Sequence, residues 1–503
     1  MRRFFSIESL FFLVLWLALM IGGRSRFLRD PGTFWHTVTG EKILETHSFI
    51  DRDPYTFTFA NDPWIPYQWL SEIGMAKLSQ LGGLDSLLVT AVVLLAALFA
   101  WLGGRVIRQG GLHPAVAGML LAFAIFASSS HFHVRPHLFT MLGMAITYSL
   151  LCAVEAGRTS VKKLLWLVPL FLLWTNLHGG MLGGLATLIL ATGGWILWIP
   201  RLRKQWPILI LVCIFGGLTM FATPYGLRLA DTWRIIMASS ALPQIIKEHA
   251  PPGWDELPTW AIVGFAAIYL FLLAGVPRKE IRIVWLLPLV WFYLGMSRVR
   301  HAPLFSIIGI LAIADFFPKT YWAKRLVSQG SDWFMPPADE PKKSSMLWLA
   351  IPLVVWILCL SVQSQKADIP VIGSHWAQLE PTLWPVDLEE NLSKIENEHA
   401  EPVDIFNEFI HGGYLIQYHP KMRVFIDDRC ELFITSPTDN FLLDFVQGEY
   451  DDPAGHIAKW EARFGKFPYA MPRTDSGYDQ YFSHSDAWVL IQRGQSASLY
   501  RRK

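Results

Sequence analysis

The sequence predicts an all-α polytopic membrane bundle of about eleven transmembrane helices, followed by a small α/β domain. Its 503 residues are 52% hydrophobic and 17% charged, whereas soluble domains carry about 25% charged residues. Residues 86–317 hold 17 Lys or Arg and 7 Asp or Glu, but residues 364–503 hold 13 and 22. A membrane body is therefore followed by an acidic, water-soluble tail, and an entirely soluble protein is excluded.

Eleven apolar stretches have the length of spanning helices, since a bilayer core of about 30 Å needs ~20 apolar helical residues. Gly, Pro and charge clusters separate them. They are residues 6–23, 86–107, 113–130, 137–155, 163–177, 181–199, 206–222, 258–276, 282–297, 302–317 and 346–363. No small-x-small cleavage site follows the first stretch before Arg24, so we expect it to remain as an uncleaved span.

Lys and Arg gather in alternate connections between these spans, and short cytoplasmic loops are the ones that retain positive charge. The enriched connections contain Arg2, Arg3, Arg105, Arg108, Arg158, Lys162, Lys163, Arg201, Arg203, Lys204, Arg278, Lys279, Arg282, Lys319, Lys324, Arg325, Lys342 and Lys343. The N-terminus is therefore expected in the cytoplasm, and residues 24–85 and the tail are expected outside.

These boundaries divide the chain into four parts: a membrane domain 1–317 that includes the outer loop 24–85, a polar cytoplasmic linker 318–345, a last transmembrane helix 346–363, and an extracytoplasmic α/β domain 364–503. In the tail, strands are expected at 403–406, 423–426, 488–491 and 498–500, and helices at 409–417, 438–446 and 454–464. The tail has no phosphate loop, nucleophile elbow or zinc signature, so we expect an accessory domain that binds an acceptor or a partner.

The outer loop 24–85 has a structure of its own. The Asp30-Pro31-Gly32 turn precedes a helix from Thr33 to about Glu45, and residues 69–81 follow a second helical period. Between them, residues 55–59 alternate like a strand, and Asn61-Asp62-Pro63 forms a turn before Trp64. This pattern predicts a hairpin that pins the loop over the helix ends.

Ionisable side chains of useful chemistry collect on the predicted outer face. Either they cap the helices or they line a hydrated site that opens outward. Three arginines go against the charge bias, and their planar guanidinium groups match phosphate oxygens. An anionic ligand would explain them, with lipid headgroups or loop carboxylates as the alternative partners. The candidate substrate-binding residues are Arg135, His137, His178, Arg298, Arg300, His301 and Glu72.

Three aspartates are candidate catalytic residues. Asp30 lies just beyond the first span and is the favoured general base, or else it caps the turn at Thr33. Asp51 and Asp53 are two residues apart, and they either bind a divalent cation such as Mg²⁺ or Mn²⁺ or bond to their own turn. The four cysteines predict no disulfide framework, and no basic face indicates a nucleic-acid partner.

Several motifs resemble a family of large bacterial membrane proteins allied to the GT-C glycosyltransferases, and the similarity covers nearly the whole chain. In the loop the motifs are Asp30-Pro31-Gly32-Thr33-Phe34-Trp35-His36, Ile50-Asp51-Arg52-Asp53-Pro54-Tyr55-Thr56-Phe57, and Pro63-Trp64 through Trp69-Leu70-Ser71-Glu72. Later motifs are Thr223-Pro224-Tyr225-Gly226, Gly412-Gly413-Tyr414-Leu415 and Val424-Phe425-Ile426-Asp427-Asp428-Arg429. Asp428 stands where the family pattern has Gly.

The resemblance implies a bacterial inner-membrane enzyme of GT-C type that takes a sugar from a polyprenyl-phosphate carrier and transfers it to an acceptor on the outer face. In such enzymes the first outer loop carries an essential carboxylate, which matches Asp30. An acceptor hydroxyl would attack the anomeric carbon in one displacement, which inverts that centre. The alternatives are a non-enzymatic scaffold for envelope assembly and a transporter, although the sequence has no internal repeat of the kind many transporters show.

Overall fold

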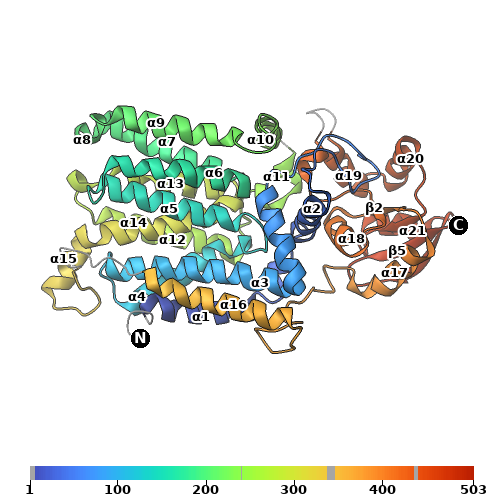
Figure 1. The fold of residues 1–503 in the computed structure, drawn as a ribbon, viewed down its shortest axis with the longest axis horizontal. Helices are drawn as coiled ribbons and strands as arrows, with labels where there is room; N and C mark the ends of the chain where they lie inside the picture. Colours follow the sequence, from blue (N-terminus) through green and yellow to red (C-terminus); the bar gives the residue numbers. More distant parts are fainter. Residues whose placement is uncertain (1–5, 240, 337–345, 435–439) are drawn as a thin grey trace.

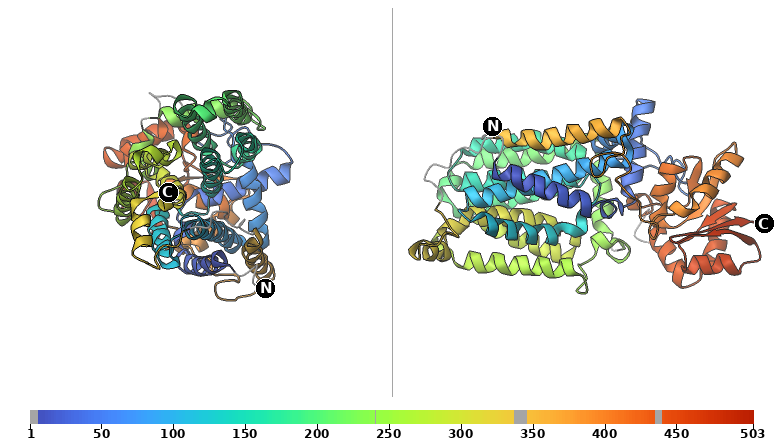
Figure 2. Two further views of the ribbon diagram at one scale, coloured as in Figure 1. Left: turned by 90° about the vertical axis from the view of Figure 1, so that its left-hand side faces the viewer. Right: turned by 90° about the horizontal axis from the view of Figure 1, so that it is seen from below.

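The computed structural model describes residues 6–239, 241–336, 346–434 and 440–503. Most helices run side by side along the long axis of the molecule, and a small α/β domain lies at one end of this bundle (Figure 1). Figure 2 (left) looks along these helices. We call the end that carries the α/β domain the domain-side end, and the opposite end the far end. The predicted fold class is confirmed.

Every predicted span coincides with an apolar helix. They are α1 (Ile7–Gly22), α3 (Trp69–Arg108), α4 (Pro114–Ser128), α5 (Leu138–Glu155), α6 (Leu167–Leu177), α7 (Met181–Trp198), α9 (Trp206–Leu218), α12 (Leu257–Ala274), α13 (Leu287–Ser297), α14 (Ala302–Phe316) and α16 (Ala350–Ser364). Seven segments of the described chain are long and apolar enough to cross a membrane, and three further apolar helices are shorter. These features indicate a multi-pass membrane protein.

Helix α3 contains two elements that the sequence predicts as separate, the helix at residues 69–81 and the span at residues 86–107. Its backbone leaves helical geometry at Gly82 and Gly83, so residues 69–81 turn away from the apolar part that follows. The segment at residues 69–81 is the second of the two helices predicted for the outer loop. The first one is α2 (Gly32–Thr46), which packs against α3.

A buried carboxylate inside the far end of the bundle is paired with two arginines. Asp315 is fully buried and accepts from Arg158 at 2.5 Å and from Arg282 at 2.9 Å. The Gln109 amide and the Trp285 indole also donate to it, at 2.7 Å and 2.8 Å. A buried carboxylate is tolerated only when it is paired and hydrogen-bonded, so Asp315 ties several helices together.

The first described residues of α1 and the described part of the linker lie at this far end (Figure 1). Within the linker the described residues form α15 (Tyr321–Ser328). Arg2, Arg3, Pro337, Lys342 and Lys343 lie outside the described residues, as does part of the predicted 438–446 helix.

The α/β domain contains a five-stranded sheet of order β2-β1-β3-β5-β4. Its strands are β1 (Val403–Asn407), β2 (Met422–Val424), β3 (Tyr469–Met471), β4 (Trp488–Arg493) and β5 (Ser498–Arg502). The first three pair in parallel, and β5 pairs antiparallel with β3 and β4. The predicted strands are present, and β3 is an addition. The helices of the α/β domain are α17 (Glu389–Glu398), α18 (Gly412–Tyr418), α19 (Phe441–Tyr450), α20 (Pro453–Phe464) and α21 (Gly477–His484).

The hairpin predicted in the outer loop is confirmed in part. The return at Trp64 pairs antiparallel, but with the residues before the 55–59 segment: Arg52 bridges Pro63, and the Trp64 amide donates to the Asp51 carbonyl at 3.2 Å. The 55–59 segment itself pairs elsewhere, since Thr56 forms a parallel bridge with Val424 at the end of β2. The Phe57 and Val424 amides complete this pairing by donating to Val424 and Tyr55 carbonyls, both at 3.1 Å. Alternation along residues 55–59 places Tyr55 and Phe59 in the core of the α/β domain. The loop thus adds an edge to the sheet of that domain.

Candidate active site

A cavity of about 270 Å³ opens among the domain-side ends of α5, α7, α13 and α14. Two arginines and five histidines line it, and no carboxylate of the described chain does. The basic residues are His131, His137, His178, His249, His301, Arg298 and Arg300. Its other walls are apolar and include Met141, Trp233, Trp291 and Leu304. We call this site the basic cavity, and its lining suits an anionic group attached to an apolar body.

The positive charge in the basic cavity comes from the two arginines. Arg298 makes no ion pair with any residue that the structure describes, and Arg300 donates to His249 Nε2 at 2.6 Å. Burial, followed by the charge of Arg300, lowers the pKa of His249 to about 3, so this imidazole is neutral and accepts the hydrogen bond. A pair of guanidinium groups without carboxylate partners is a strong site for phosphate oxygens.

His178 is held in one tautomer. The Gly180 amide donates to its Nδ1 at 3.0 Å, and Thr140 Oγ1 lies 2.7 Å from the same atom. Thr140 in turn accepts from the Trp174 indole at 2.9 Å. Because an amide only donates, Nδ1 is the acceptor and the proton of the neutral ring is on Nε2. Burial and the nearby His137 lower the pKa of His178 well below its ordinary value, so His178 offers one neutral donor.

An ionic cluster lies beside the basic cavity. Arg135 Nη1 donates to Asp30 Oδ2 and to Glu248 Oε1, both at 2.9 Å. Asp30 Oδ1 accepts from the Gly32 amide at 2.8 Å, so this carboxylate also caps the start of α2. Burial alone would raise the pKa of Glu248, but Arg135 and then His131 hold it well below its usual range. Glu248 therefore stays ionised between the cluster and the cavity.

The α/β domain adds a carboxylate to this cluster. Asp428 Oδ1 accepts from the Trp35 indole at 2.7 Å, and the side chain is half-buried. Burial, followed by the charge of Asp30, raises the pKa of Asp428 well above its ordinary value. Sequence reasoning missed this residue as a site candidate. The available signal was an acidic pair, Asp427-Asp428, directly after a strand.

Close backbone packing sets the position of the cluster. A Cβ on Gly32 would lie 2.8 Å from Asp30 Oδ1 and 2.9 Å from Arg135 Nε. A Cβ on Gly413 at the start of α18 would clash with the Pro31 carbonyl oxygen. Both glycines therefore let neighbouring groups approach closely, and the second one seats the α/β domain on the Asp30 turn.

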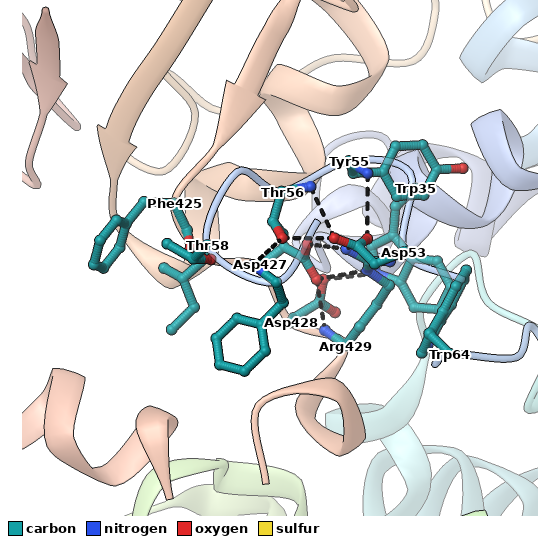
Figure 3. Close-up of polar contacts among 12 residues, drawn as sticks. Trp35, Asp53, Tyr55, Thr56, Thr58, Trp64, Phe425, Asp427, Asp428 and Arg429 are labelled. Atoms are coloured by element: carbon teal, nitrogen blue, oxygen red, sulfur yellow. Dashed lines mark hydrogen bonds and ion pairs between the residues drawn. The ribbon is translucent and has the colours of Figure 1, made fainter. Parts of the chain in front are cut away.

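Asp53 is not placed to act as a base. Its carboxylate is fully buried and accepts from the Tyr55 and Thr56 amides at 3.2 Å and 3.0 Å, and from Thr56 Oγ1 at 2.5 Å. Arg429 Nη2 also donates to Asp53 Oδ1, at 2.7 Å. Figure 3 shows this network between the outer loop and residues 425–429. Asp53 is a structural tie between the two domains.

The predicted cation site of Asp51 and Asp53 does not fit the structure. The Asp51 side chain is 64% exposed and faces Arg228, whereas that of Asp53 is fully buried. Two carboxylates that face different surroundings do not form a shared oxygen site. Within the described ranges no group of three or more His, Cys, Asp or Glu is arranged for a metal ion.

Glu72 lies in a separate buried pair. Its Oε1 is 2.8 Å from His36 Nδ1, and both side chains are fully buried. Burial, followed by the charge of Arg135, lowers the pKa of His36 well below its ordinary value. Burial also raises the pKa of Glu72 well above its ordinary value, so the two groups share a single buried hydrogen bond. This contact fixes α2 against α3, and Glu72 does not line the basic cavity.

The predicted residues therefore divide into groups. His137, His178, Arg298, Arg300 and His301 line the basic cavity, while Asp30 and Arg135 form the adjacent ionic cluster. Glu72, Asp51 and Asp53 lie elsewhere. The cavity and the cluster are neighbours because His131 and Arg300, which line the cavity, act electrostatically on Glu248 of the cluster.

No protein-family model matches the sequence, and no curated protein matches it significantly. Among solved structures, the chain is similar to ArnT from Cupriavidus metallidurans bound to undecaprenyl phosphate, with 13% identity, a TM-score of 0.45 and 97% of each chain covered. It is also similar to ArnT from the same organism in the apo state, with 15% identity, a TM-score of 0.37 and the same coverage. At these identities and TM-scores the likeness is one of overall fold alone.

Proposed function

We propose that this chain is a membrane glycosyltransferase that transfers a sugar from a polyprenyl-phosphate carrier to an acceptor at the domain-side end of the bundle. The basic cavity is the observation that carries the proposal. Its two arginines lack carboxylate partners there, and its apolar walls lie among helices long enough to reach the bilayer. A lipid phosphate has the matching chemistry, because an anionic head is attached to an apolar chain.

The cavity residues act on the leaving group. As the bond from the anomeric carbon to the carrier phosphate breaks, negative charge grows on the phosphate oxygens. Arg298 and Arg300 stabilise that charge, and His178 Nε2–H adds a neutral hydrogen bond. Donors that are already oriented toward developing charge lower the barrier most.

The ionic cluster supplies the base. An acceptor hydroxyl that attacks the anomeric carbon must lose its proton, and a carboxylate next to the cavity takes it. Asp30 remains the favoured residue, since Arg135 and the Gly32 amide fix its direction. Asp428 is the second candidate, because its raised pKa makes it the stronger proton acceptor once ionised. A single displacement then inverts the anomeric centre.

The location follows from the charge distribution. Arginines and lysines collect at the far end of the bundle, which we assign to the cytoplasm. The α/β domain and both sites then lie outside the bacterial inner membrane, where the acceptor would be met.

Purified full-length protein in proteoliposomes tests this function. A panel of radiolabelled undecaprenyl-phosphate sugars is incubated with a bacterial lipid and glycan extract, and transfer of label is measured. We expect Asp30→Asn or Asp428→Asn to lower the rate by about 100-fold or more. Arg298→Gln is expected to raise the concentration of lipid-linked sugar donor that gives half the maximal transfer rate. The exposed Asp51→Asn is the matched control and should retain wild-type transfer. Full transfer in all three cluster and cavity variants would refute the proposal.

A further inference from the structure

A second and larger cavity lies on the side of the bundle. It is a groove of about 1060 Å³ between α1 and α4. The groove is lined by small and apolar side chains, including Val14, Ala18, Gly22, Gly118, Ala122 and Phe126. A Cβ added at Gly22 would meet nothing within 4 Å, so the groove has free space beside this part of α1. In Figure 2 (right) α1 runs along the outside of the bundle. Within a membrane this groove faces lipid chains.

Charged and polar residues surround the domain-side mouth of the groove. Arg26 lines it, is exposed, and makes no ion pair with any described residue. The other two cations at the mouth are neutralised: Arg29 pairs with Glu380 at 2.8 Å, and Lys247 pairs with Glu256 at 2.6 Å. The mouth therefore offers one unpaired positive charge.

Two further polar side chains, which belong to neither of the ion pairs at this mouth, line it together with Arg26. Ser130 and His133 line the same mouth, and Ser130 Oγ and His133 Nδ1 have no hydrogen-bond partner in the described part of the chain. Buried polar atoms normally have a partner. A ligand with oxygen acceptors would provide one after a small rotation of either side chain.

The charges at the mouth select among lipid headgroups. A phosphomonoester carries between one and two negative charges near neutral pH, and its excess charge would face the Glu256 carboxylate. The ammonium of a zwitterionic headgroup would lack a free carboxylate partner at the mouth, because Glu256 pairs with Lys247 and Glu380 pairs with Arg29. A phosphodiester with one net negative charge matches the single free guanidinium.

We propose that the groove between α1 and α4 binds an anionic glycerophospholipid, with its chains along the two helices and its phosphodiester at Arg26, Ser130 and His133. This site is separate from the basic cavity and does not depend on the sugar-transfer reaction. The turn that carries His131 and His133 forms a wall of both sites, since His131 lines the cavity and His133 lines the groove. A bound lipid would therefore support that wall.

Native mass spectrometry of the detergent-purified full-length protein tests the site. The delipidated protein receives equimolar phosphatidylglycerol, phosphatidylethanolamine and undecaprenyl phosphate, and the retained adducts are measured. Because undecaprenyl phosphate also has the basic cavity as a site, the occupant of the groove is identified by which adducts the groove variants lose. Of the two glycerophospholipids, we expect phosphatidylglycerol to be retained better. Arg26→Gln should reduce its retention about fivefold, the value for one cationic contact to an anionic headgroup. Arg278→Gln at the far end removes the same charge and should have no effect.

Ala122→Phe provides an independent test, because it fills the groove and leaves the mouth unchanged. We expect it to reduce phosphatidylglycerol retention as well. Equal retention of phosphatidylethanolamine and phosphatidylglycerol would show that the groove is only an apolar surface. Loss of undecaprenyl phosphate adducts instead of phosphatidylglycerol adducts in Ala122→Phe would show that the groove is a carrier site. Either result overturns the proposal, as does unchanged phosphatidylglycerol binding in Arg26→Gln. Arg298→Gln should leave phosphatidylglycerol retention unchanged, which separates this site from the basic cavity.

Discussion

Arg429 of the α/β domain donates to Asp53 of the outer loop at 2.7 Å, and both side chains are completely buried. The same guanidinium also pairs with Asp427 at 2.6 Å and lies over the Tyr55 and Trp64 rings, with centroid distances of 4.8 Å and 4.5 Å. These contacts join the loop after the first span to the last domain of the chain (Figure 3). The α/β domain is therefore held in a fixed position over the candidate site.

Arg429→Ala is expected to release the outer loop from the α/β domain. Two carboxylates, Asp53 and Asp427, would remain buried without their partner, and loss of one member of a buried pair costs about 3–5 kcal/mol. Hydrogen exchange of the amides at residues 53–59 should therefore become faster by about 100-fold or more. Arg423→Ala is the matched control, since its pair with Asp404 is exposed and is worth about 1 kcal/mol at most. Equal exchange in both variants would contradict the role of Arg429.

Gly32→Ala is expected to disturb the ionic cluster. The new methyl group would contact Asp30 Oδ1 and Arg135 Nε at under 3 Å, and such overpacking costs about 1–3 kcal/mol. The thermal midpoint of the detergent-purified protein should fall, together with any activity that depends on Asp30. Gly74→Ala is the control, because nothing lies within 4 Å of its added Cβ. A midpoint for Gly32→Ala equal to that of Gly74→Ala would show that the cluster tolerates the methyl group.

The α/β domain is expected to lose stability as the pH rises through neutrality. Burial, followed by the charge of Glu449, raises the pKa of Glu408 to about 7. The folded state then binds more protons than the unfolded state between the two pKa values, so the stabilisation is complete below the unfolded pKa and is lost as the pH approaches 7. The loss amounts to about 3 kcal/mol.

Thermal unfolding of the full-length protein at pH 5 and pH 8 measures this effect. The midpoint of the wild type should fall by several degrees more than that of Glu408→Gln, which has no charge to bury. The same pH dependence in both proteins would exclude Glu408 as its source.

Asp315→Ala is expected to loosen the far end of the bundle. Arg158 and Arg282 would both lose their buried carboxylate partner, at a cost of about 3–5 kcal/mol. Thermal inactivation in detergent should be clearly faster than for Asp231→Ala, whose ion pair with Arg234 is exposed. Identical inactivation rates would show that Asp315 does not hold these helices together.

The helices of the membrane domain could be predicted closely because an apolar stretch of sufficient length is a local property of the chain. The stretch at 86–107, for example, is the apolar part of α3, and its boundary at Gly82 and Gly83 follows from the two glycines. Strands were predicted less completely. The three residues of β3 are too few to show a period of two, and they become a strand only because β1 and β5 lie on either side.

The candidate site was predicted in its composition but not in its arrangement. The sequence alone determined that cationic and imidazole side chains lie at one end of the helices, because their positions relative to the spans decide this. Only the tertiary structure decided that Asp53 pairs with Arg429, that residues 55–59 join the sheet at Val424, and that Asp428 reaches the Asp30 cluster. Those contacts depend on how the α/β domain sits on the loop, and local sequence periodicity carries no information about packing between distant segments.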